Sequence, residues 1–224
     1  GAPSGMPSAP LPPALQDPIR NDAQMLYVLG MENLNFCGHE VHRAKRCGGH
    51  LASVTSQAEK DLVDALLVQK FGSGHDENIW LGGYQLVENR NDTHIGDEDE
   101  WSWSDGSPWT LDFWENGQPD NFVLEVKQDV WKGQHHLQQN GDGSWKDENG
   151  CHGWFAPKSY GVYILPMNYT SDADCTNTMS NLIPYCPPGY YSLSLEPGSV
   201  CQVCPDGTYS EQYGTTGSCP AQEN

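Results

Sequence analysis

Hydrophobic and polar positions follow a helical period in one part of the chain. Between Ser56 and Gly72, four apolar residues recur at the spacing of one helix face: Leu62, Val63, Leu66 and Leu67. Ser56 and Glu59 form an S-x-x-E capping box at the start of this run, and Gly72 and Gly74 provide a stop. The pattern predicts a helix that begins after Ser56 and ends before Gly72.

Shorter elements are expected on either side of this helix. The apolar run at 25–29 predicts a strand, and the alternating run "SYGVYILP" at 159–166 predicts a closing strand that ends at a proline. The segment "EVHRAKRC" at 40–47 predicts a short helix. From "IWLGGY" at 79–84 to about residue 150, aromatic runs alternate with long polar stretches without a helical period. Long loops of this kind are uncommon in a compact domain unless they are functional.

The segment after residue 166 contains an internal repeat. The segments from Cys186 to Cys201 and from Cys204 to Cys219 each place their two cysteines fifteen positions apart and open Cys-Pro-x-Gly-x-Tyr-Ser. A unit this short has almost no core, so we expect one bridge in each, Cys186 with Cys201 and Cys204 with Cys219. A redox-active Cys201-x-x-Cys204 pair is the disfavoured alternative, because no thioredoxin-like βαβ pattern surrounds it.

Composition divides the chain into three parts. Six of the first twenty residues are proline, so residues 1–22 are expected to form a linker or extended arm. The eight tryptophans lie between Trp80 and Trp154 and mark the packed body. We therefore predict a globular domain at 23–166 and a Cys-rich module at 167–224.

Charge and cysteine content narrow the function classes. The 224-residue chain has 30 acidic and 11 basic residues, a net charge of −19, which disfavours nucleic acid and anionic membranes as partners. Its eight cysteines indicate disulfides in an oxidising compartment, and sequons at Asn91 and Asn168 point to glycosylation there. No apolar run approaches the roughly 20 residues of a membrane span. We expect a secreted or cell-surface protein, processed or part of a larger one, with no membrane insertion in this chain.

Five segments, in this order, resemble the C-type lectin-like domain: "GGHLASVTSQAE", "IWLGGY", "WSWSDGSPW", "W-x-x-G-QPDN" and "GSWKDENGC". The resemblance covers roughly residues 24 to 166. It implies an α+β fold with two helices, small antiparallel sheets and a long loop region that carries calcium and sugar sites. The tryptophans of "WLGG" and "WSWSDGSPW" are then core anchors. The tail resembles ephrin-receptor-like Cys-rich repeats.

The resemblance also implies a binding site. Sugar-binding members of the family hold one Ca²⁺ ion and a sugar on a tripeptide with a central, normally cis proline, and Gln118-Pro119-Asp120 matches its galactose type. Gln118 and Asp120 would coordinate the metal and the sugar hydroxyls. Phe122, two positions after the aspartate, would stack on the apolar face of the sugar.

Two further metal ligands are expected, and one position departs from the family. Asp147 lies in Trp145-Lys146-Asp147, which stands where the family has Trp-Asn-Asp, and it would bind both metal and sugar. Lys146 cannot coordinate a cation. In an alternative arrangement, its ammonium pairs with Asp120 in place of the metal. A further family acid has no direct counterpart here; Glu125 is the expected substitute, and Asp129 is the alternative.

Four cysteines lie outside the repeat and leave three possible connectivities: Cys37, Cys47, Cys151 and Cys175. The resemblance favours Cys47 with Cys175, as an imitation of the family's helix-to-last-strand bridge. A zinc site is the disfavoured alternative for the segment at 37–47, which contains Cys37, His39, His42 and Cys47, because the spacing matches no zinc signature. The acidic stretch at 97–100 is more often a solvated loop than a second calcium site.

The predicted function is an extracellular, calcium-dependent carbohydrate-binding module of the galactose or N-acetylgalactosamine type. The alternative is a calcium-free module of the same fold that makes protein contacts in an extracellular assembly. An enzyme is not expected, because the chain has no G-x-S-x-G, H-E-x-x-H or phosphate-loop motif.

Overall fold

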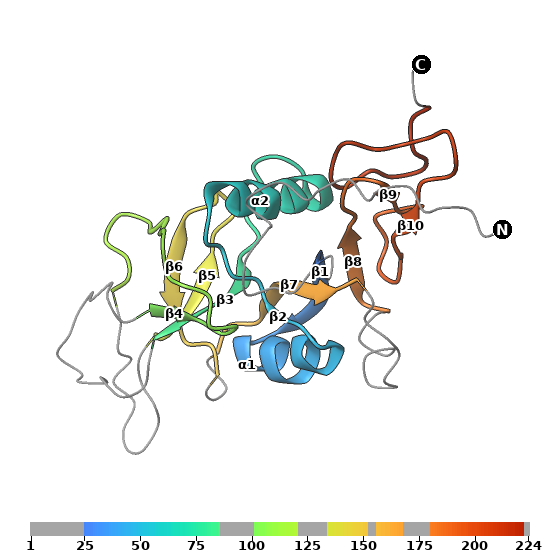
Figure 1. Ribbon diagram of the computed structural model, residues 1–224. Helices are drawn as coiled ribbons and strands as arrows, with labels where there is room; N and C mark the ends of the chain where they lie inside the picture. Colours follow the sequence, from blue (N-terminus) through green and yellow to red (C-terminus); the bar gives the residue numbers. More distant parts are fainter. Residues whose placement is uncertain (1–24, 86–100, 121–133, 152–155, 168–179, 222–224) are drawn as a thin grey trace.

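The computed structural model describes residues 25–85, 101–120, 134–151, 156–167 and 180–221. It contains two helical segments and two sheets (Figure 1). The helical elements are α1 (Phe36–His39), the π-helical turn η2 (Glu40–Ala44), the 3-10 turn η3 (Lys45–Cys47) and α2 (Gln57–Phe71). The first segment therefore begins four residues before the helix expected at 40–47.

Helix α2 begins and ends where its sequence predicts. The Ser56 side chain accepts a hydrogen bond from the Glu59 backbone N–H (3.3 Å), and the Glu59 carboxylate accepts one from the Thr55 backbone N–H (2.7 Å). At its other end, Gly72 has a φ of 88°, a conformation that favours glycine. Local signals thus fix both ends of this helix.

The main sheet has eight strands, six of them in the order β6-β5-β3-β7-β1-β8, while β2 pairs with β7 and β4 with β3. Their bounds are β1 (Met25–Leu34), β2 (His50–Leu51), β3 (Ile79–Gln85), β4 (Trp101–Trp103), β5 (His136–Gln139), β6 (Trp145–Glu148), β7 (Ser159–Pro166) and β8 (Leu182–Tyr185). All pairs are antiparallel except β3 with β7. The expected α+β class is confirmed, and β1 extends five residues beyond the strand expected at 25–29.

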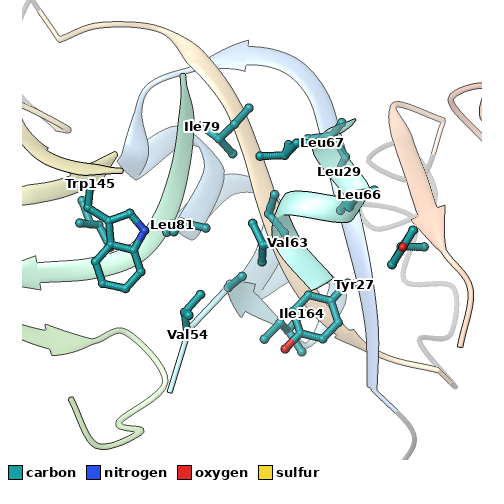
Figure 2. Close-up of a cluster of buried hydrophobic side chains, with 14 of the residues drawn as sticks. Tyr27, Leu29, Val54, Val63, Leu66, Leu67, Ile79, Leu81, Trp145 and Ile164 are labelled. Carbon is teal, nitrogen blue, oxygen red and sulfur yellow. The ribbon is translucent and has the colours of Figure 1, made fainter. Parts of the chain in front are cut away.

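The sheet has a helical segment on each face, so both of its faces are buried. Alternate residues of β1 divide between two hydrophobic clusters: Tyr27 and Leu29 belong to the first, Leu26 and Val28 to the second. The first cluster lies under α2 and contains Val63 and other helix residues (Figure 2). The second includes Phe36 of α1, on the opposite face of the sheet (Figure 1). None of the helices in the described part has the length and apolar character that a membrane crossing requires.

The segment after residue 180 packs against the body. Strand β8 adds to the edge of the sheet beside β1, and a second, two-stranded sheet of β9 (Tyr190–Tyr191) and β10 (Gln202–Val203) follows. Cys186 is bonded to Cys201 and Cys204 to Cys219, the pairing predicted from the repeat. The Gln69 side chain of α2 donates a hydrogen bond to the Gly214 carbonyl (2.8 Å). This module and strand β6 lie at opposite ends of the sheet.

Candidate functional site

The turn that carries Gln118, Pro119 and Asp120 is fixed against β6, at the edge of the sheet. The backbone N–H of Trp145 donates to the carbonyl of Phe113 (2.8 Å), and the N–H of Glu115 donates to the carbonyl of Trp145 (2.8 Å). These two bonds hold residues 113–115 alongside the strand. The chain then turns, and the Gln118–Pro119 peptide bond is cis, as the resemblance implied.

Gln118, Asp120 and Asp147 meet at this turn. The Asp147 carboxylate Oδ1 accepts a hydrogen bond from the Asp120 backbone N–H (3.0 Å). The Gln118 amide oxygen accepts one from the Asp147 backbone N–H (3.2 Å). Asp147 is 1% exposed, so its carboxylate is a buried acceptor beside the turn. The structure therefore brings together three residues that the sequence separates by up to 29 positions.

Lys146 does not occupy the position beside Asp120. Successive side chains of a strand point to opposite faces, and along β6 Trp145 and Asp147 are buried while Lys146 and Glu148 are half-buried. Among the described residues, the ion pair of Lys146 is with Glu148 (Nζ–Oε2 3.9 Å). The alternative in which its ammonium pairs with Asp120 is therefore wrong for this structure.

The donor set at the turn suits a hard cation. Ca²⁺ binds oxygen ligands and takes six to eight of them. The two carboxylates of Asp120 and Asp147 and the amide oxygen of Gln118 are such ligands, and the carboxylates carry the charge that balances a divalent ion. The remaining residues of the expected site, Phe122 and Glu125, lie outside the described residues, as do Asn91, Asn168 and the acidic stretch at 97–100.

A partly buried network of polar side chains that the sequence did not predict connects this site to α2. The Lys60 ammonium contacts the Asp64 carboxylate (2.6 Å), which also accepts a hydrogen bond from the Gln139 amide (2.9 Å). Gln139 in turn accepts from the Trp145 indole N–H (3.3 Å). Trp145 begins the strand that carries Asp147, so these polar contacts help to position the site. Lys60 and Asp64 are four apart on a helix, a spacing that indicates an ion pair but no tertiary role.

An aromatic cluster packs around Trp145, next to the loop that leads into the turn. Trp145 packs against Trp103, Trp109 and Trp114 at ring-centroid distances of 5.7, 5.7 and 6.1 Å. Trp103 is 1% exposed, as expected for a core anchor. Because these rings are large and rigid, they fix the loop that leads into the Gln-Pro-Asp turn without regular secondary structure.

Asp105, in the loop after β4, forms a second buried polar cluster. Burial raises its pKa, but this is outweighed by the nearby His50 imidazole (Nε2–Oδ2 3.4 Å) and by hydrogen bonds from Ser107 and Ser53, which together leave the pKa below its ordinary value. The carboxylate thereby connects β2 to the loop that begins the aromatic cluster. The aspartate of "WSWSDGSPW" therefore has a structural role.

The segment at 37–47, for which zinc binding was the disfavoured alternative, makes other contacts in the structure. Cys37 is bonded to Cys151, and Cys47 is also disulfide-bonded, while Cys175, the partner that the resemblance favours for it, lies outside the described residues. The His39 ring contacts the Tyr163 hydroxyl and the Ser159 carbonyl. Disulfide sulfurs are not thiolate ligands, so the zinc interpretation is wrong.

Comparison with known proteins agrees with a lectin-like module. No family model matches the chain. The chain is 35% identical over 78 residues to the galactose-specific lectin nattectin of Thalassophryne nattereri, covering 35% of this chain and 42% of that protein. It is 34% identical over 74 residues to ladderlectin of Oncorhynchus mykiss, covering 33% of each. The chain thus spans less than half the length of these relatives. Human lithostathine, a solved structure, aligns with 23% identity and a TM-score of 0.45, over 63% of this chain and 92% of that one.

Proposed function

We propose that this protein is an extracellular carbohydrate-binding module that binds galactose or N-acetylgalactosamine in a calcium-dependent manner. The observation that carries this proposal is the meeting of Gln118, Asp120 and the buried Asp147 at one turn. These residues would hold Ca²⁺, whose remaining coordination positions take two vicinal hydroxyls of the sugar. Glu125 would complete the ligand set, and Phe122 would stack on the sugar ring.

The sugar class rests on the order of the tripeptide and on one relative. Gln-Pro-Asp is the galactose-type order in the family that the sequence resembles, and nattectin is named as a galactose-specific lectin. A site of this kind needs no catalytic group, so the proposed role is binding rather than catalysis. Glycans with terminal galactose or N-acetylgalactosamine are the proposed partners, and glycosylation at Asn91 and Asn168 is proposed with the extracellular location.

A second candidate is a calcium-free module for protein contacts, and Lys146 is the observation that favours it. A lysine stands where the family places an asparagine ligand, which removes one oxygen from the set and adds a positive charge next to Asp147. Both effects weaken binding of a cation, even though the ammonium pairs with Glu148.

Calorimetric titration of the full chain separates the two candidates. We expect calcium to bind with a Kd on the order of 10⁻⁴–10⁻³ M, the range of extracellular modules, and galactose to bind when calcium is present and not when it is chelated. Asp120→Ala should abolish both heats. Asp112→Asn is the matched control, because it removes an exposed carboxylate from the same loop and should change neither.

Absence of calcium heat at about 10 mM, well above this Kd range, would overturn the proposal in favour of the protein-contact module. In that case, the same titration of the Lys146→Asn variant shows why calcium does not bind. Binding gained in this variant means that the lysine has disabled an otherwise complete site, whereas no gain means that the site lacks further ligands.

A further inference from the structure

The Cys37–Cys151 bridge has a histidine directed at one of its sulfurs. The Nε2 atom of His136, on β5, lies 3.2 Å from the Sγ atom of Cys151. The two Sγ atoms of the bridge and a ring nitrogen of His136 all lie within 4.8 Å of one another. All three residues are half-buried, so the bridge is within reach of solvent.

Neighbouring groups fix both the orientation and the tautomer of this imidazole. The backbone N–H of Gly150 donates to its Nδ1 atom (3.2 Å), so in the neutral ring the proton is on Nε2, facing the Cys151 sulfur. The Phe36 ring packs against the imidazole at 4.4 Å between centroids. A Cβ atom on Gly150 would lie 2.6 Å from the imidazole, so this position suits a glycine. The His136 N–H is therefore a preorganised donor to sulfur.

The bridges of the C-terminal module lack this arrangement. In the described part of the chain, no imidazole contacts the sulfurs of Cys186–Cys201 or Cys204–Cys219. One cysteine of each is buried, Cys186 at 0% and Cys219 at 7% exposure. These two bridges are internal controls for the effect of the histidine and of solvent access.

We propose that Cys37–Cys151 is a thiol–disulfide exchange site that reacts with low-molecular-weight thiols. An external thiolate attacks the Cys37 sulfur and forms a new S–S bond there, while the Cys37–Cys151 bond breaks and its electron pair passes to Cys151. The His136 Nε2–H stabilises that leaving thiolate by donating a hydrogen bond to it, and solvent then supplies the proton. The products are a mixed disulfide on Cys37 and a thiol on Cys151, and the reverse reaction restores the bridge.

The choice of Cys37 as the attacked atom follows from the position of the ring. A leaving thiol departs faster when its pKa is lower, and a nearby imidazole donor lowers the pKa of a cysteine. The imidazole contacts the Cys151 sulfur, so that sulfur receives this stabilisation, and the ring also occupies one approach to it. The reaction needs neither calcium nor sugar, so it stands independently of the proposed function.

Treatment of the oxidised full chain with limiting reduced glutathione tests the proposal. The reaction is quenched with N-ethylmaleimide, and mass spectrometry of the peptides locates each label. We expect glutathione on Cys37 and maleimide on Cys151 before either module bridge opens. An equal rate of opening at Cys37–Cys151 and at the two module bridges, or glutathione mainly on Cys151, would overturn the proposal, and neither result depends on a variant.

His136→Leu tests the histidine itself. The variant should open the Cys37–Cys151 bridge about tenfold more slowly and lose the preference for Cys37, because leucine has no N–H to donate to the leaving thiolate. His135→Leu is the matched control: it changes the adjacent histidine, which contacts Gln85 (Nδ1–Oε1 2.8 Å), and should leave rate and preference unchanged. Unchanged exchange in a folded His136→Leu variant contradicts the role of the imidazole.

Discussion

The body of the protein and its C-terminal module are stabilised in different ways. In the body, two hydrophobic clusters fill both faces of the sheet, and side chains as large as Trp80, Trp103 and Trp145 are fully buried. Beyond Tyr185, the buried apolar residues among those described are Cys186, Pro187 and Cys219. The same chain therefore relies on burial where its sequence is apolar and periodic, and on crosslinks where the sequence offers almost no core.

A core truncation in the body should have the largest effect on stability. Leu66 of α2 is fully buried in the first cluster, so Leu66→Ala should lower the free energy of unfolding by about 2–5 kcal/mol through lost burial and a cavity. Leu193 of the module is 65% exposed, and Leu193→Ala should change the free energy of unfolding by less than about 0.5 kcal/mol. Urea unfolding of both variants measures the difference. Equal losses would show that the module also depends on apolar burial.

Removal of a module bridge should have a comparable effect that is confined to the module. The Cys204–Cys219 bridge closes a loop with a sequence separation of 15, for which the loop-entropy relation gives about 3 kcal/mol. Cys204→Ala with Cys219→Ala should therefore unfold the segment around it. Hydrogen exchange should show lost protection after residue 186 and unchanged protection in α2 and β7. Lost protection throughout the body would contradict the comparison.

Sequence predicts the elements of the body better than their contacts. The period of Val63, Leu66 and Leu67 and the capping box at Ser56 act within one helix, so α2 was predictable to its ends. The Gln-Pro-Asp turn was predictable as a motif. The pairing of β8 with β1, the Cys37–Cys151 bridge and the ion pair of Lys146 were not, because each depends on how the chain folds back or on which face of a strand a residue occupies.

The junction between body and module combines apolar packing of Leu195 and Tyr213 with a few polar contacts, so the loss of one hydrogen bond there should have a smaller effect. Gln69→Ala removes the hydrogen bond to the Gly214 carbonyl and should cost about 0.5–1.5 kcal/mol. Gln57→Ala is the control, because Gln57 lies on the same helix and donates to Asp61 without contacting the module. Hydrogen exchange around Gly214 should increase in the first variant alone. The same increase in both variants would mean that the helix, rather than the junction, is affected.

The smallest effect is expected at the aromatic side of this junction, and it depends on pH. Tyr213 stacks on Tyr185 (centroids 6.0 Å), and burial, with a contribution from Tyr185, raises its pKa to about 12. An unfolded tyrosine titrates near pH 10. Below that value both states hold the proton. As the pH rises from about 10 towards 12, the unfolded state ionises first, so the stability contributed by neutral Tyr213 is lost.

Tyr213→Phe should remove this alkaline sensitivity at little cost near neutral pH. The Tyr213 hydroxyl has no hydrogen-bond partner among the described residues, so its deletion leaves no described group unpaired. Urea unfolding between pH 8 and 11 should therefore show the two proteins within about 0.5 kcal/mol of each other at pH 8. The variant should become relatively more stable as the pH passes 10. Parallel profiles over the whole range would mean that the phenol ionises as readily in the folded protein as in the unfolded chain, and that the module does not bury it against β8.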